Sequence, residues 1–227
     1  MQDAVESALS AIAGAPVSVT CAGRTDSGVH AIEQVVHFDT DADRPATAWV
    51  RGVNSSLPES VAVLWSQPVE AAFHARYSAV SRTYRYRLIN RAVRPALAAR
   101  HAGWVHASLK IENMREAAAL LLGEHDFSAF RSAQCQAKSP VRKIYEIQVD
   151  ERPEGRIDFV VRANAFLHHM VRNIVGTLIY VGKGSFSPLY VRDVLLSKDR
   201  SKAAPTFGPE GLYLEKVRYE EKWGLPQ

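Results

Sequence analysis

Apolar positions follow helical spacing in some segments and strand spacing in others, which predicts a mixed set of elements. Val5, Leu9 and Ile12 recur at intervals of four and three and predict a helix over residues 2–13. Because helices and strands do not alternate strictly, we expect an α+β fold with a mixed, largely antiparallel sheet and helices packed on it. Further helices are expected at residues 46–55, 111–122, 168–181 and 189–197, and strands at 17–21, 34–39, 61–65, 81–89, 143–149, 156–163 and 212–218.

The composition is that of a globular chain. Of 227 residues, 47% are hydrophobic and 23% charged, which excludes disordered, collagen-like and coiled-coil proteins. The uncharged stretch at residues 173–182 is too short to span a bilayer, and the acidic N-terminus is no signal peptide. We therefore expect a soluble, cytoplasmic protein without membrane contact. Cys21 and Cys135 form neither a disulfide framework nor a CxxC pair, so structural zinc is not expected.

The charge is distributed unevenly along the chain. Residues 1–70 carry a net charge of −6, residues 71–145 carry +9, and residues 146–227 carry +1. No carboxylate occurs from Ala71 to Ile111, where seven arginines and one lysine are interleaved with tyrosines. Such a stripe is typical of a nucleic-acid-binding surface, although a solvated strand face with acidic residues opposite is equally compatible with it.

Three motifs resemble known sites but lack essential residues. Residues 23–28 have the glycine spacing of a phosphate loop, yet the lysine that binds the phosphates is missing. Residues 39–43 mimic the start of a calcium loop without its glycine and glutamate. His168 and His169 are adjacent, so on a helix they point about 100° apart and are poorly placed to share a metal. We expect one of them in the core and the other at the surface or facing RNA.

The chemistry is expected in the polar loop between Gly23 and Gly28. Arg24 and Asp26 are two residues apart, so both can reach one cavity. A nearby arginine favours the ionised form of an aspartate, and a positioned carboxylate can act as a nucleophile. A tight turn closed by a hydrogen bond from Asp26 to its own backbone is the structural alternative.

Motifs spread along the whole chain resemble one family. The loop AGRTDSGVH at residues 22–30 is similar, nearly letter for letter, to the catalytic motif of the TruA-type tRNA pseudouridine synthases. Each motif alone is weak, but the ordered set at family-like spacing is specific. The other similar stretches are QVVHF at 34–38, FHAR at 73–76, YRY at 84–86, GEHDF at 123–127, ANAFLHHMVRN at 163–173 and EGLY at 210–213.

The resemblance implies the pseudouridine synthase fold, with an RNA-binding cleft across the sheet. It also implies isomerisation of uridine to pseudouridine in the anticodon arm of tRNA, at positions 38, 39 and 40, without metal or cofactor. A homodimer that binds tRNA across both subunits is expected. Residues 1–90 would form an N-terminal half with the catalytic loop and residues 91–227 a C-terminal half, in one continuous catalytic unit.

The resemblance also implies roles for single residues. Asp26 matches the catalytic aspartate, which attacks either C6 of the base or C1′ of the sugar, and Arg172 matches its basic partner. Tyr84 matches the tyrosine that stacks on the target base, Arg24 the arginine that holds the nucleotide out of the stack, and Leu212 packs under the uracil. RNA contacts are expected from Arg76, Arg82, Arg85 and His168.

Two alternatives stay open at this point. The family usually begins with a further strand and loop before the first helix, whereas this sequence opens directly at the expected helix. An RNA-binding module or tRNA chaperone without catalysis is therefore the first alternative. The second is a hydrolase with an aspartate nucleophile, a class that usually uses magnesium and an acidic cluster. The nearest acids in sequence are Glu33 and Asp39, with no local pair. The distinguishing feature is whether Asp26 faces the same cleft as Tyr84 and Arg172.

Overall fold

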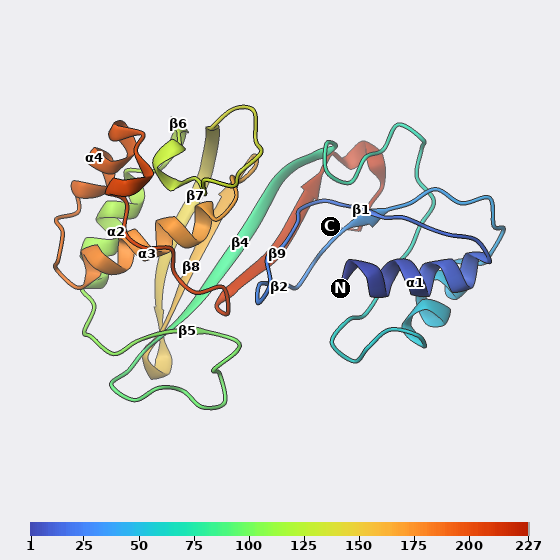
Figure 1. Ribbon diagram of the computed structural model, residues 1–227, viewed down its shortest axis with the longest axis horizontal. Helices are drawn as coiled ribbons and strands as arrows, with labels where there is room; N and C mark the ends of the chain where they lie inside the picture. The colour runs from blue at the N-terminus through green and yellow to red at the C-terminus, as the bar shows by residue number, and fades with distance from the viewer. Residues whose placement is uncertain (227) are drawn as a thin grey trace. The chain divides into compact units, whose positions relative to one another are not determined.

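A computed structural model describes residues 1–226, which form two compact units that interleave along the chain (Figure 1). The smaller unit combines residues 1–24, residues 34–80 and the segment from Arg218 onward. The larger unit combines residues 25–33 and 81–217. From the sequence we expect two halves, residues 1–90 and 91–227. That division differs from these two units, and it stays a prediction.

The smaller unit has its own hydrophobic core beneath the first helix. Helix α1 (Gln2–Ala13) covers the predicted range and ends at Gly14. Strands β1 (Thr20–Cys21) and β3 (Val36–His37) pair antiparallel, and Ala48–Gly52 forms a π-helical turn. The buried core residues of this unit are Ala8, Leu9, Val17, Val19, Trp49 and Val53.

The strand predicted at residues 61–65 is wrong, since none of these residues lies in a strand. The reason is local. The side chain of Asn54 accepts a hydrogen bond from the Val63 amide at 2.7 Å and donates one to the Val63 carbonyl at 2.8 Å. These bonds satisfy the backbone polar groups that a sheet would otherwise pair.

The larger unit is built on a seven-stranded mixed sheet (Figure 1). The main path runs β2-β9-β4-β8-β7-β6, and β5 pairs with β4 off this path. Pairs β2·β9 and β4·β5 are parallel, whereas β4·β8, β7·β8 and β6·β7 are antiparallel. The expected α+β class with a mixed, largely antiparallel sheet is thus confirmed. The strands are β2 (His30–Ala31), β4 (Ala79–Asn90), β5 (Gly103–Val105), β6 (Gly123–Asp126), β7 (Val141–Arg152), β8 (Arg156–Ala163) and β9 (Leu212–Tyr219).

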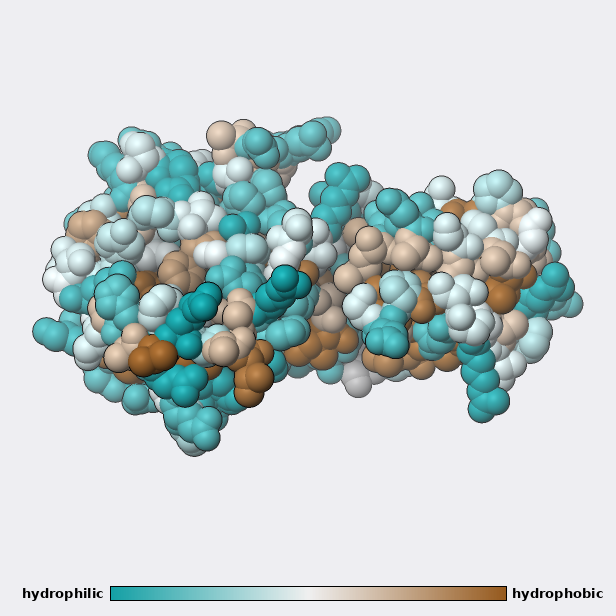
Figure 2. All heavy atoms as spheres, turned by 60° about the horizontal axis from the view of Figure 1, so that its bottom comes forward, coloured by the Kyte–Doolittle hydropathy of each residue, from teal (hydrophilic) through white to brown (hydrophobic). Residues whose placement is uncertain are grey.

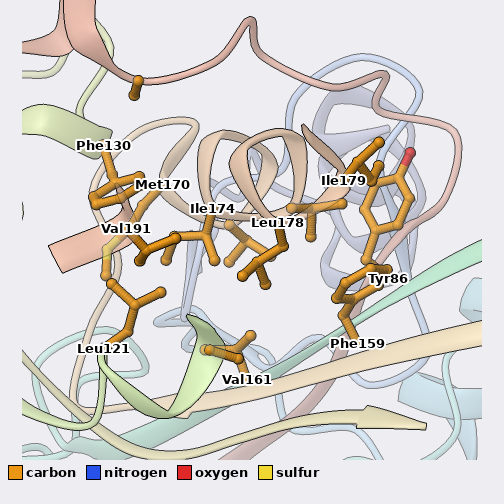
Figure 3. Packing of buried hydrophobic residues seen from close by; sticks show 14 of the residues in the cluster. Tyr86, Leu121, Phe130, Phe159, Val161, Met170, Ile174, Leu178, Ile179 and Val191 are labelled. Carbon is orange, nitrogen blue, oxygen red and sulfur yellow. The ribbon is translucent and has the colours of Figure 1, made fainter. Parts of the chain in front are cut away.

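Helices α2 (Ile111–Ala119), α3 (Met170–Gly182) and α4 (Tyr190–Ser197) contribute to the core of the larger unit. Helix α3 is buried on nearly every side, and Figure 3 shows its Ile174 and Leu178 pointing toward the strand that carries Val161. Because side chains alternate along β4, Tyr86 enters this core while Arg85 emerges on the other face of the sheet.

Burial raises the pKa of the Tyr86 hydroxyl far above its usual range. That hydroxyl donates a 2.9 Å hydrogen bond to the Gly208 carbonyl, which ties the segment before β9 to the sheet.

On the face shown in Figure 2, hydrophilic residues are widespread and hydrophobic residues form smaller groups among them. Within residues 1–226, no helix has the length and apolar character needed to cross a membrane.

Candidate active site

Asp26 opens a tight turn in the larger unit. The Val29 amide donates a 3.0 Å hydrogen bond to the Asp26 carbonyl, and Gly28 between them has φ of 82°. A four-residue turn with positive φ at its third position favours glycine there. A side chain at Gly28 would also lie 3.0 Å from Cγ of Pro209. The sequence therefore fixes the backbone next to Asp26 while its side chain remains about one-third exposed.

The carboxylate of Asp26 is directed at the segment that leads into helix α3. Its Oδ1 lies 3.1 Å from His168 Nε2, and its Oδ2 lies 3.1 Å from His169 Nε2 and 3.3 Å from Arg172 Nη1. Within the described residues, these contacts take the place of the hydrogen bond to its own turn that was the structural alternative. Both oxygens are thus held by side chains about 140 residues away in sequence.

The two histidines correct an expectation from the sequence. Helix α3 begins at Met170, so His168 and His169 belong to the turn before it and not to the helix itself. His169 adopts φ of 63°, an uncommon conformation for a residue other than glycine. This conformation brings the two imidazole rings to 3.9 Å between centroids and turns both toward Asp26. The expectation that one of the two histidines lies in the core is therefore wrong, because both side chains are partly exposed.

The turn with the histidines is anchored through its backbone. The His168 amide donates to Cys135 Sγ at 3.4 Å, and the His168 carbonyl accepts from the Ser132 amide at 3.0 Å. Burial, the like charges of His168 and Arg172, and a smaller like-charge effect of Arg200 lower the pKa of His169, although Asp26 opposes them. His169 therefore stays neutral to lower pH than an exposed histidine.

Arg172 is the best-shielded member of the cluster, with 13% of its side chain exposed. Its Nε donates a 2.8 Å hydrogen bond to the Phe207 carbonyl, which leaves Nη1 directed at Asp26. The next residue, Asn173, is fully buried and binds the neighbouring segments through its amide. The bond to the Phe207 carbonyl and the buried neighbour Asn173 thus fix the position of the guanidinium in the absence of substrate.

Tyr84 and Arg82 on strand β4 contact the segment that leads to the histidines. The ring of Tyr84 packs edge-on against Phe166 at 4.9 Å between centroids. The guanidinium of Arg82, which is largely buried, donates a 3.1 Å hydrogen bond to the Asn164 carbonyl. Leu212 begins strand β9 and is buried in the core of the same unit. Tyr84, Leu212 and Asp26 all belong to the larger unit.

The other arginines expected from the sequence lie in different surroundings. Arg85 forms ion pairs with Asp158 at 3.2 Å and Glu215 at 2.7 Å, on the sheet face opposite Tyr86. Arg24 and Arg76 belong to the smaller unit, where both are exposed. Arg76 lies 5.8 Å from the ring centre of Tyr77.

The arrangement has a carboxylate with two imidazoles and a guanidinium within hydrogen-bond distance. Such a carboxylate can act as a nucleophile or a base, and the guanidinium can balance the negative charge that it carries. One oxygen of Asp26 and the two histidine nitrogens also lie within 4.8 Å of one another, which is a possible metal-ligand set. His169 is the residue that sequence reasoning missed, and the repeated histidine before the helix was its only signal.

This chain is similar in sequence to known proteins along its whole length. A family model described as "tRNA pseudouridine synthase" matches residues 1–78 and 117–220. The chain is 58% identical over 226 residues to tRNA pseudouridine synthase A of Dechloromonas aromatica, covering all of this chain and 86% of that protein. It is 56% identical over 231 residues to the protein of the same name from Herminiimonas arsenicoxydans, again along its whole length and covering 84% of the relative.

Proposed function

This chain belongs to the tRNA pseudouridine synthase A family and isomerises uridine in tRNA, and we propose that it acts on the anticodon arm, with Asp26 as the nucleophile. The observation that supports this role is the carboxylate of Asp26, paired with Arg172 at 3.3 Å and still partly exposed. The target uridines are those at positions 38, 39 and 40.

In the proposed reaction, the Asp26 carboxylate attacks either C6 of the uracil or C1′ of the ribose. The bond between N1 and C1′ breaks, the uracil turns, and C5 bonds to C1′ in its place. The bond between Asp26 and the substrate breaks, at C1′ when C5 takes its position or at C6 by elimination, and its electron pair returns to the carboxylate. The proton on C5 then leaves and N1 takes up a proton, so the product is an isomer of the substrate. The Arg172 guanidinium holds the carboxylate in place and balances its charge while it is not bonded to substrate.

The target nucleotide must leave the helical stack to reach Asp26, at a cost of a few kcal/mol. We propose that Tyr84 stacks on the flipped base, which stabilises it by about 1–3 kcal/mol. Arg24 would keep the nucleotide out of the stack, and Leu212 would pack under the uracil. The T-shaped contact with Phe166, at 4.9 Å between ring centroids, supports this role because it orients the Tyr84 ring.

We propose that the remaining tRNA contacts come from Arg76, Arg82 and His168, with Arg85 contributing less because two carboxylates already neutralise it. The chain would act as a cytoplasmic homodimer, with one tRNA contacting both subunits. Phosphate contacts of this kind make affinity depend steeply on salt.

The target position can be tested with tRNA transcripts that carry a single uridine at position 38, 39 or 40. After reaction, pseudouridine is located by carbodiimide modification and primer extension. Modification at these positions, and its absence from a transcript with cytidine at all three, would support the proposal. Modification confined to uridines outside the anticodon arm would refute the proposed target while leaving the isomerase activity in place.

A further inference from the structure

The carboxylate and the two imidazoles at the active site form a donor set of another kind. We propose that Asp26, His168 and His169 bind a borderline transition-metal ion such as Zn²⁺, and that the bound ion blocks isomerisation. The second half of this proposal rests on the proposed function of Asp26, whereas metal binding itself can be tested without it.

The spacing of the ligand atoms suits such an ion. Zinc bonds to imidazole nitrogen and carboxylate oxygen measure about 2.0–2.2 Å, so tetrahedral ligands lie about 3.4 Å apart. The two distances from Asp26 oxygens to histidine Nε2 atoms are both 3.1 Å. One donor atom from each of the three residues lies within 4.8 Å of the others. The two 3.1 Å contacts use different oxygens of Asp26, so the side chains must readjust around a shared ion, and they would then fill three positions of a tetrahedron.

The chemistry of the donors also selects the class of ion. Two imidazoles and one carboxylate suit zinc, copper, nickel and cobalt better than magnesium or calcium, which prefer oxygen ligands. The three side chains are 26–34% exposed, so an ion can enter and keep water in its fourth position. The backbone bonds of His168 to Ser132 and Cys135 hold the turn in place before the ion binds.

Arg172 sets the strength of the site. Its guanidinium lies 3.3 Å from the same Asp26 oxygen that approaches His169, and its positive charge opposes a second cation. The ligating carboxylate would keep this hydrogen bond, as ligating carboxylates usually do. We therefore expect reversible binding, weaker than in a structural zinc site. A bound ion would occupy the electron pairs with which Asp26 attacks the substrate.

The test measures binding first. The chain is freed of metal with EDTA, exchanged into chelator-free buffer and titrated with Co²⁺, whose visible absorption reports tetrahedral coordination, and with Zn²⁺ by calorimetry. His169→Asn is the main variant because asparagine tolerates the left-handed conformation of this position, and His168→Gln is the second. His106→Asn changes an exposed histidine of the same unit and is the matched control.

We expect one equivalent of metal in the native chain and in His106→Asn, and affinity lower by about tenfold or more in the other two variants. Equal affinity in all four proteins would overturn the site. Zn²⁺ should also stop tritium release from tRNA labelled at uridine C5, and EDTA should restore it. Full activity with saturating Zn²⁺ would overturn the blocking role. If the metal-free chain releases no tritium, the proposed function fails, and the Co²⁺ titration still decides the site.

Discussion

The buried amide of Asn173 connects helix α3 with the segments that hold Arg172. Its Nδ2 donates to the Phe130 carbonyl at 2.7 Å, and its Oδ1 accepts from Thr206 Oγ1 at 2.7 Å and Arg200 Nη2 at 3.1 Å. Replacing Asn173 with leucine keeps the branched arrangement of the side-chain heavy atoms but removes all three bonds. The Phe130 carbonyl would then be buried without this partner.

The size of the effect follows from these contacts. An orphaned buried carbonyl costs about 1–3 kcal/mol, and a lost hydrogen bond to a charged group costs about 1.5–3 kcal/mol. Leucine offsets part of this by burying more apolar surface. We expect Asn173→Leu to lower the free energy of unfolding by about 3 kcal/mol and Tm by about 6–12 °C. Because the Phe207 carbonyl that binds Arg172 follows Thr206 directly, the rate of isomerisation should fall as well.

Urea unfolding and calorimetry measure the stability, and tritium release measures the activity. Thr177→Val is the matched control, since Thr177 is equally buried in the same helix. Among residues 1–226, its hydroxyl bonds only the Asn173 backbone carbonyl, at 2.9 Å, so the loss should stay below about 1.5 kcal/mol. A loss of less than about 1 kcal/mol in Asn173→Leu, or one equal to that of the control, would refute the reasoning.

Three further outcomes are expected. Tyr84→Phe keeps the stacking ring, so tRNA affinity should persist. It removes the hydroxyl that we expect to help transfer the proton from C5, so tritium release should slow by roughly a hundredfold; undiminished release would limit Tyr84 to stacking. Arg76→Gln should lower the salt dependence of tRNA binding by about one unit in a log–log plot, whereas Arg85→Gln should change it less; equal slopes would contradict this. Burial, followed by the charge of His74, lowers the pKa of His37, so its contribution to stability is present above pH 6.5 and is lost as the pH falls. His37→Gln should therefore reduce the loss of unfolding free energy on acidification, and an unchanged loss would contradict this.

The sequence predicted those elements whose apolar residues repeat over a whole helix or strand. Helix α1 and the long strand β4 are examples, because the packing of one face leaves a periodic pattern. Strands β2 and β5 have two and three residues, too few for a period, and they exist because β9 and β4 offer a partner. Such pairing depends on contacts distant in sequence and leaves no local signal.

In the candidate site, too, the sequence predicted what depends on local conformation and missed what depends on distant contacts. The glycine at position 28 and the polar residues around Asp26 marked the loop correctly as a turn, since its conformation is local. The orientation of His169 could not be predicted from the sequence. Its left-handed backbone shifts the helix start to Met170, so the two imidazoles point toward Asp26 together and not about 100° apart. The ion pairs of Arg85 were also missed, because Asp158 and Glu215 come from other strands.

Asp26 is the residue on which the proposed isomerisation depends. The most direct test is tritium release from a tRNA transcript labelled at uridine C5, with the native chain and Asp26→Asn compared at equal tRNA occupancy. Asparagine keeps the size of the side chain but is not a nucleophile of the same kind. We predict that the variant binds tRNA with native affinity and releases no tritium. Release by Asp26→Asn at the native rate would contradict the account.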